Sequence, residues 1–353
     1  MPLHNPHVRR TVSALLVAIA VAGTLHGATA RAEDAGESPT VGETLVREAS
    51  GYGWRRWLRH RVYKPADDAR YGLQFDEHWE QCNADLPVIV LVHGFNSTPQ
   101  RNDAVLAPLR AAGYACAGFA YPNDLTLSES AERLSAALKE FAAAHADRKL
   151  ALVTHSMGGL VARACLEDPA LDPGDVTRLI QIAPPTHGTL LAHAAVATDI
   201  WEHWLGRSGG APWTRWRDSI VDGLGEAGDD LVPGSPFLTK LNARDRNPAV
   251  QYSILLGTAA SVSEDEMGWI RDAVAKTGGR VPGLSQASDR LHDLLVDMDE
   301  LVDGKGDGVV AVKRGRLAGV DDVALLPFGH LTCTSGDSED GVSVQQAVFA
   351  RLQ

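Results

Sequence analysis

KLALVTHSMGGLVARACL, residues Lys149 to Leu166, joins a short apolar run to an amphipathic segment through the turn-forming sequence THSMGG. Such a run is typical of a buried strand, and the segment after the glycines has the spacing of a helix. The stretch therefore predicts a strand, a sharp turn and a helix, with Ser156 in the turn. A serine in this position exposes its hydroxyl beside helix N-terminal N–H groups, which stabilise negative charge. Ser156 is thus a candidate nucleophile; the alternative is an ordinary helix N-cap.

Apolar runs alternate with helical patterns along the chain on both sides of this stretch. We expect strands at 87–92, 114–120, 149–154, 176–183, 252–256 and 323–326. Helices are expected at about 103–112, from a Thr126–Glu129 capping box to about residue 141, and at 344–352. This alternation predicts an α/β fold with a mostly parallel sheet and helices on both faces. Ligands bind such sheets at the carboxyl ends of the strands.

The N-terminus has the pattern of a secretory signal peptide. Arg9 and Arg10 precede an apolar run from Val12 to Gly23, and two A-x-A sequences end at Ala30 and Ala32. The run is shorter than the about 20 residues of a membrane-spanning helix. We therefore expect cleavage after Ala32 and export to the periplasm or beyond the cell.

The charge of the chain argues against polyanionic partners. The formal net charge is −12, and removal of residues 1–32, with three arginines and no acidic residue, changes it to −12 − 3 = −15. A strongly acidic chain is a poor ligand for nucleic acid and for anionic membranes. We expect no nucleic-acid partner, and no obligate protein partner is evident.

Four cysteines leave two interpretations open. An exported chain with Cys82, Cys116, Cys165 and Cys333 can form two disulfides in three connectivities, or keep buried free thiols. None of the spacings is that of a zinc site, because the chain has no C-x-x-C pair.

A serine nucleophile requires a base and an acid. The base removes the hydroxyl proton, and the acid holds the base in the correct tautomer. In the chain order serine, acid, histidine, the downstream candidates are Asp307 and His330, which lie beside predicted strands.

Six short motifs occur in one order along the chain: HGF at 93–95, HSMGG at 155–159, APPTHGT at 183–189, VPGSPFLTKLN at 232–242, GDGVV at 306–310 and GH at 329–330. Together they resemble the α/β-hydrolase superfamily, in particular bacterial lipases and esterases. The resemblance extends from about Leu86 to the C-terminus. After the expected signal peptide at 1–32, this leaves an N-terminal extension at 33–85. The resemblance implies a hydrolase domain at 86–353, with a tryptophan-rich cap or lid inserted at about 187–247.

The resemblance also implies a mechanism without cofactor or metal. Ser156 would be the nucleophile, His330 the general base and then acid, and Asp307 the residue that orients His330. The backbone N–H groups of Phe95 and Met157 would form the oxyanion hole. The expected substrate is a small-molecule or lipid ester, with transient contact to a lipid surface. Acyl transfer, thioester or amide cleavage, and a catalytically silent binding protein remain alternatives.

Several residues have a second interpretation. Thr154 replaces the first glycine of G-x-S-x-G, which predicts more distance to the neighbouring strand or turn. Asp307 lies among glycines, as in a solvated turn, and Asp265 or Glu264 is the reserve acid. An EF-hand loop is excluded because Lys305 and Arg314 occupy its ligand positions. We expect His93 and His155 to be structural and His187 to line the pocket.

Overall fold

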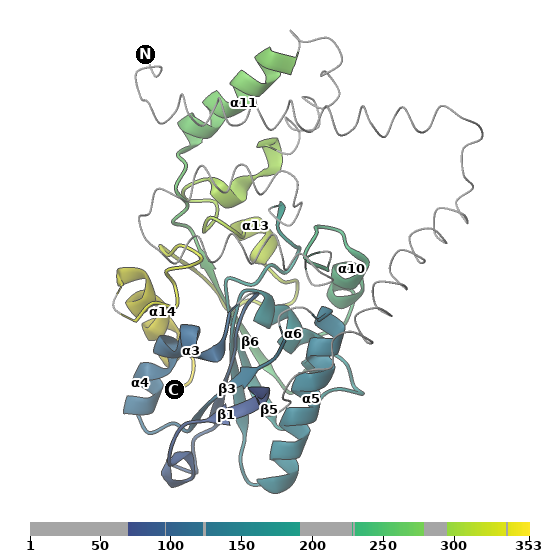
Figure 1. The fold of residues 1–353 in the computed structure, drawn as a ribbon, viewed down its shortest axis with the longest axis vertical. Coiled ribbons are helices and arrows are strands. Elements are labelled where there is room, and N and C mark those ends of the chain that lie inside the picture. The colour runs from purple at the N-terminus through teal and green to yellow at the C-terminus, as the bar shows by residue number, and fades with distance from the viewer. Residues whose placement is uncertain are drawn as a thin grey trace, which may run out of the picture.

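A computed structural model describes residues 70–95, 97–122, 125–190, 228, 230–278, 295–336 and 338–353. These residues form a seven-stranded sheet in the order β1-β3-β2-β4-β5-β6-β7 (Figure 1). The strands are β1 (Gly72–Phe75), β2 (Val88–Val92), β3 (Cys116–Ala120), β4 (Leu150–His155), β5 (Val176–Ile182), β6 (Gln251–Gly257) and β7 (Val323–Leu326). All neighbouring pairs except β1 and β3 are parallel. The predicted α/β class with a mostly parallel sheet is therefore confirmed.

Helices cover both faces of the sheet. Alternate residues of β2 point to opposite faces: Val90 packs in one core with residues of α5 (Leu127–Ala144) and α6 (Met157–Leu166), and Leu91 packs in the other with α14 (Glu339–Ala350). Figure 1 shows α5 and α6 on one side of the strands and α3 (Pro99–Asn102), α4 (Ala107–Ala111) and α14 on the other. Central strands covered in this way explain the uninterrupted apolar runs in the sequence.

The helix boundaries follow the capping residues. At α5 the predicted capping box is present, with the Thr126 hydroxyl accepting from the Glu129 N–H at 3.2 Å. The helix expected at 103–112 is instead divided into η4 (Asp103–Leu106) and α4, and α3 precedes them. Pro108 cannot donate a helical hydrogen bond, which favours a break before α4. The last helix begins earlier than residue 344 because Ser338 caps it at the Gly341 N–H.

The sheet includes residues that the sequence assigned to the N-terminal extension. Strand β1 pairs antiparallel with β3, outside the parallel region. Its Phe75 ring stacks on Trp79 and on Phe141 of α5, with ring centroids 4.4 and 5.4 Å apart. The four residues GLQF are too short and too mixed to signal a strand on their own. The sequence therefore predicted no strand before residue 87, and β1 was missed.

Three of the predicted segments lie wholly or largely outside the described residues. These are the signal peptide at 1–32, the N-terminal extension, of which 33–69 are not described, and the inserted segment, of which 191–227 and 229 are not described. Its described end contains α10 (Pro236–Asn242), which Ser235 caps at the Leu238 N–H. No helix among the described residues has the length and apolar character needed to cross a membrane.

A buried ion pair at the end of α6 is hydrogen-bonded to α10. The fully buried Arg163 guanidinium donates to both carboxylate oxygens of Glu167, at 2.9 and 3.1 Å. It also donates to Asn242 Oδ1 at 2.9 Å, and the Asn242 amide donates to the Thr186 carbonyl at 2.8 Å. The Asn242 amide therefore joins the motifs APPTHGT and VPGSPFLTKLN directly, and Arg163 of α6 holds that amide.

All four cysteines are free thiols in the structure, so neither of the two disulfides that the sequence allows is present. Cys116, Cys165 and Cys333 are fully buried. Burial raises the pKa of Cys116 and of Cys165 to about 12, which keeps both thiols protonated.

Candidate active site

Ser156 occupies a strained turn between β4 and α6. Its φ of 52° and ψ of −126° are rare for a residue with a side chain. The side chain makes no capping hydrogen bond to α6. The N-cap interpretation therefore does not hold, and the hydroxyl lies instead 2.9 Å from His330 Nε2.

The glycines after Ser156 allow α6 to approach the sheet closely. A Cβ atom on Gly158 would lie 2.4 Å from the Val92 carbonyl oxygen and 2.6 Å from that of His93. Thr154, which replaces the first glycine of the motif, pairs in register with Val92 of β2 and with Gln181 of β5. The threonine therefore does not interrupt the sheet.

The structure brings the three predicted side chains together. His330 Nε2 lies 2.9 Å from Ser156 Oγ, and His330 Nδ1 lies 2.8 Å from Asp307 Oδ2. An ionised carboxylate only accepts hydrogen bonds, so Nδ1 carries the proton and the lone pair of Nε2 faces the hydroxyl. Ser156, Asp307 and His330 are 9, 4 and 5% exposed. The arrangement can transfer a proton from the hydroxyl to the imidazole.

The GDGVV motif orients Asp307. Its Oδ1 atom accepts from the Val309 and Val310 N–H groups at 2.9 and 2.7 Å, which leaves Oδ2 for His330. The backbones of the two residues are also joined, because the His330 N–H donates to the Asp307 carbonyl at 2.8 Å. Asp307 is thus a buried, fixed acceptor and not a solvated turn residue.

Gly257, at the end of β6, is a residue of the site that the sequence analysis missed. A Cβ atom here would lie 2.6 Å from Asp307 Cβ and 2.5 Å from the Phe328 carbonyl oxygen. Only glycine lets the acid loop and the histidine loop converge at this strand end. A glycine that ends an apolar run was the available signal.

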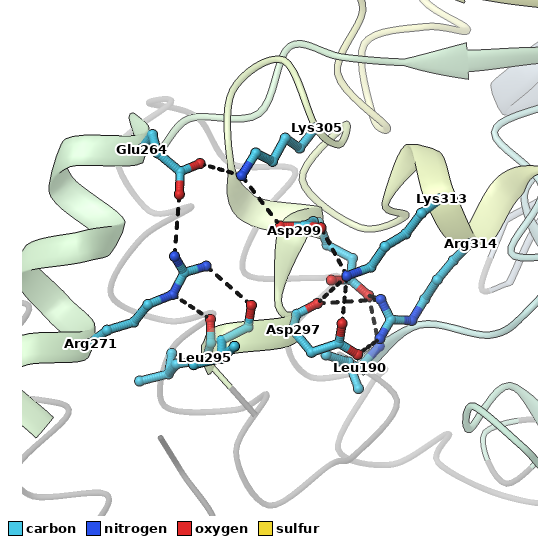
Figure 2. Close-up of polar contacts among 11 residues, drawn as sticks. Leu190, Glu264, Arg271, Leu295, Asp297, Asp299, Lys305, Lys313 and Arg314 are labelled. Carbon is cyan, nitrogen blue, oxygen red and sulfur yellow. Dashed lines mark hydrogen bonds and ion pairs between the residues drawn. The ribbon is translucent and has the colours of Figure 1, made fainter. Parts of the chain in front are cut away.

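The reserve acids lie elsewhere. Glu264, the first residue of α11 (Glu264–Gly278), forms ion pairs with Lys305 Nζ at 2.6 Å and with Arg271 at 3.2 Å (Figure 2). Asp265 is exposed on the same helix. The pKa of Glu264 is lowered, first by its hydrogen bond to Lys305, as expected for a surface carboxylate held between cations.

Ion pairs also brace the segment that carries Asp307. Lys313 contacts Asp297 at 2.5 Å and Asp299 at 2.8 Å, and Arg314 pairs with Asp297 beside them (Figure 2). The fully buried Glu300 accepts from the Leu190 N–H at 3.1 Å, and its carbonyl accepts from the Gly308 N–H at 2.8 Å. Burial raises the pKa of Glu300.

The HGF segment at the end of β2 lies against Ser156. A Cβ atom on Gly94 would lie 3.0 Å from Ser156 Cβ, which places the Phe95 backbone one residue beyond this contact. Tyr121 fixes the segment, since its hydroxyl donates to the His93 carbonyl at 2.7 Å and its ring stacks on that of His93. The Met157 N–H is the first of α6, where N–H groups have no partner within the helix.

The remaining histidines have different surroundings. His93 is buried, with Nδ1 2.9 Å from the Gly94 carbonyl oxygen, and burial lowers its pKa to about 4. His155 is buried beside His330. His187 is exposed and lies 3.3 Å from the Asn242 amide nitrogen, at α10. Within the described ranges, no group of three or more His, Cys, Asp or Glu side chains could hold a metal ion.

Comparison with known proteins identifies solved structures that have a similar fold. A family model described as a domain of unknown function (DUF7379) matches residues 57–209. No curated protein matches by sequence. The solved structure of the Bacillus licheniformis lipase BlEst2 in its mature form is similar, with 20% sequence identity and a TM-score of 0.53 over 79% of this chain and 97% of that chain. The propeptide form of the same lipase gives 20% identity and a TM-score of 0.52 over 76% and 52% of the two chains.

Proposed function

We propose that this chain, which has the lipase- and esterase-like fold of the α/β-hydrolase superfamily, is a serine hydrolase that cleaves carboxylic esters. The observation that carries the proposal is the line of contacts from Ser156 Oγ to His330 Nε2 at 2.9 Å and from His330 Nδ1 to Asp307 Oδ2 at 2.8 Å. All three side chains are buried, and Asp307 is also held by the Val309 and Val310 N–H groups, which keeps the three groups aligned without substrate.

The proposed reaction has two halves. Ser156 Oγ attacks the ester carbonyl carbon while His330 Nε2 takes the hydroxyl proton, and the Phe95 and Met157 N–H groups stabilise the oxyanion. The C–O bond to the alcohol breaks as His330 returns the proton to the leaving oxygen. Water then attacks the acyl-serine ester, with His330 as base, and releases the carboxylic acid and free Ser156.

Acyl transfer, thioester cleavage and amide cleavage use the same three residues, so the acceptor and the leaving group decide among them. A catalytically silent binding protein is the alternative from another class. The intact set of Ser156, His330 and Asp307, in contact at 2.9 and 2.8 Å, argues against it.

Hydrolysis of p-nitrophenyl esters of increasing acyl length tests the proposal. We expect turnover by the mature chain, none above background with Ser156→Ala, and turnover close to wild type with Ser130→Ala on α5. A maximum at short chains would indicate an esterase, and a steep rise at long chains a lipase. Thioester and anilide analogues, and an added alcohol acceptor, test the related reactions. Equal rates for Ser156→Ala and wild type would contradict the proposal.

We also propose that the mature chain is exported and that its partners are ester substrates, with transient contact to lipid surfaces. The signal-peptide pattern at 1–32 supports export, and the lipase- and esterase-like fold supports the ester substrates. N-terminal sequencing of protein from the exported fraction should give Glu33. An intact N-terminus on protein confined to the cytoplasm would contradict it.

A further inference from the structure

His155 is the last residue of β4 and the neighbour of Ser156, yet the proposed mechanism gives it no role. Its ring is buried, and Nε2 lies 3.1 Å from the His330 carbonyl oxygen. A carbonyl only accepts, so Nε2 must carry the hydrogen. Nδ1 then holds the lone pair and has no hydrogen-bond partner among the described residues. Burial lowers the pKa of His155 to about 3, so the ring stays neutral at neutral pH.

The carbonyl that His155 contacts belongs to the proposed base. His330 lies on a loop after β7, where no strand pairing fixes its backbone. Its N–H donates to the Asp307 carbonyl at 2.8 Å, and its carbonyl accepts from His155 Nε2 and from Cys333 Sγ, at 3.1 Å each. The rings of His155 and His330 have centroids 4.9 Å apart.

The other edge of His155 lies against the proposed oxyanion loop. A Cβ atom on Gly94 would lie 3.2 Å from His155 Nδ1 and 3.1 Å from its carbonyl oxygen. The side chain therefore stands between Gly94 and His330, the two loops that meet at Ser156. Strand β4, which carries it, pairs with β2 and β5 through its last residues.

We infer that His155 is a positioning residue for the proposed reaction: its Nε2–H bond to the His330 carbonyl ties the base to the strand that carries the nucleophile. The inference rests on the proposed function. Ser156 follows His155 directly, so one rigid strand end fixes both the hydroxyl and the backbone of the imidazole that must receive its proton. A displacement of about 1 Å between such groups can reduce a rate about 100-fold.

Simple packing is the competing account, and a matched pair of variants separates the two. In His155→Gln, the amide nitrogen can reach the position of Nε2 and donate to His330. In His155→Asn, the same amide is one methylene shorter and cannot reach. Both variants remove the ring, so a packing role predicts similar losses for both, and a donor role predicts that glutamine rescues. Cys333→Ala removes the second donor to the same carbonyl.

The experiment measures kcat, KM, the fluorophosphonate labelling rate and the melting temperature of wild type, His155→Gln, His155→Asn and Cys333→Ala. We expect His155→Asn to lower kcat and the labelling rate by about 10- to 100-fold with KM within about twofold, and His155→Gln to recover about tenfold of that loss. Cys333→Ala should cost less than His155→Asn, and the double variant more than either. If His155→Asn does not fold, His155→Leu replaces it.

Equal kcat for the glutamine and asparagine variants, or wild-type kcat for His155→Asn, would overturn the inference. A readout independent of turnover is the NMR signal of the His330 Nδ1–H, identified by its loss in His330→Gln. We expect this signal to shift or broaden in His155→Asn and to remain in His155→Gln, and an unchanged signal in both would also overturn the inference. Wild type that neither turned over esters nor reacted with fluorophosphonate would contradict the proposed function. If the NMR signal still changed in His155→Asn and remained in His155→Gln, the positioning contact would stand.

Discussion

Gly158 of α6 touches the end of β2: a Cβ atom on it would lie 2.4 Å from the Val92 carbonyl oxygen. This contact brings the first turn of α6 beside the HGF segment. Ser156, between the two, is held at φ 52°. The close approach of α6 to the backbone of β2 at Gly158 therefore contributes to the geometry of this turn.

Gly158→Ala should disturb stability and activity together. The added methyl group meets backbone, which cannot rotate away as a side chain can, so we expect a loss of about 1–3 kcal/mol in unfolding free energy and a lower kcat. Gly268→Ala on α11 is the matched control, since a Cβ atom there meets nothing within 4 Å. This change should leave activity intact and stabilise by up to about 1 kcal/mol. Urea unfolding measures both; a harmless Gly158→Ala would disprove the close packing.

Asp307→Asn should reduce kcat by about 10³- to 10⁴-fold with little change in stability. The Asn oxygen would keep the Val309 and Val310 N–H groups, and its amide N–H would then face His330 Nδ1. The imidazole proton would move to Nε2, and a protonated Nε2 can no longer accept the hydroxyl proton of Ser156. Glu264→Gln and Asp265→Asn are the controls, expected to stay within about twofold of wild type. A large loss of kcat in either control, together with an active Asp307→Asn, would mean that the catalytic acid lies on α11 and is not Asp307.

Glu167→Ala should be among the most destabilising single changes in the described core. It leaves the fully buried Arg163 guanidinium without its carboxylate, and loss of one partner of a buried pair costs about 3–5 kcal/mol. Arg351→Ala removes an ion pair with Asp322 at the surface and should cost at most about 1 kcal/mol. Equal effects in denaturant unfolding would show that the Arg163 network is not stabilising.

Stability should fall as the pH decreases below about 6.5, the ordinary pKa of histidine. His93 and His155 have folded-state pKa values of about 4 and about 3, so between these values and 6.5 the unfolded chain binds more protons than the folded one. Acid then favours unfolding, by up to about 1.4 kcal/mol per pH unit for each histidine. His155→Gln should reduce this slope between pH 6 and pH 4, measured as unfolding free energy. An unchanged slope would mean that His155 titrates normally.

The positions of six strands and of the turn at Ser156 could be predicted because both leave a local signal in the sequence. Apolar runs such as 88–92 indicate burial on two faces, and the glycines at 158 and 306 indicate close approach to neighbouring backbone. The contact between His330 and Asp307 followed from chain order and strand-end placement, not from any local signal at Asp307 itself.

What could not be predicted depends on contacts between distant segments. Strand β1 forms because Phe75 finds Trp79 and Phe141, which lie 4 and 66 positions away in sequence. The role of Gly257 depends on two loops that follow it by 50 and more residues. His155 looks like a flanking residue until the His330 carbonyl is placed 3.1 Å from its ring.

Fluorophosphonate labelling followed by peptide mass spectrometry tests the central claim most directly, because the reagent requires an activated serine but no particular ester. The account predicts stoichiometric modification of Ser156, absent in Ser156→Ala, strongly slowed in His330→Gln, and retained in Ser130→Ala. A folded wild-type protein that remains unmodified, or carries the label on another residue, would contradict it.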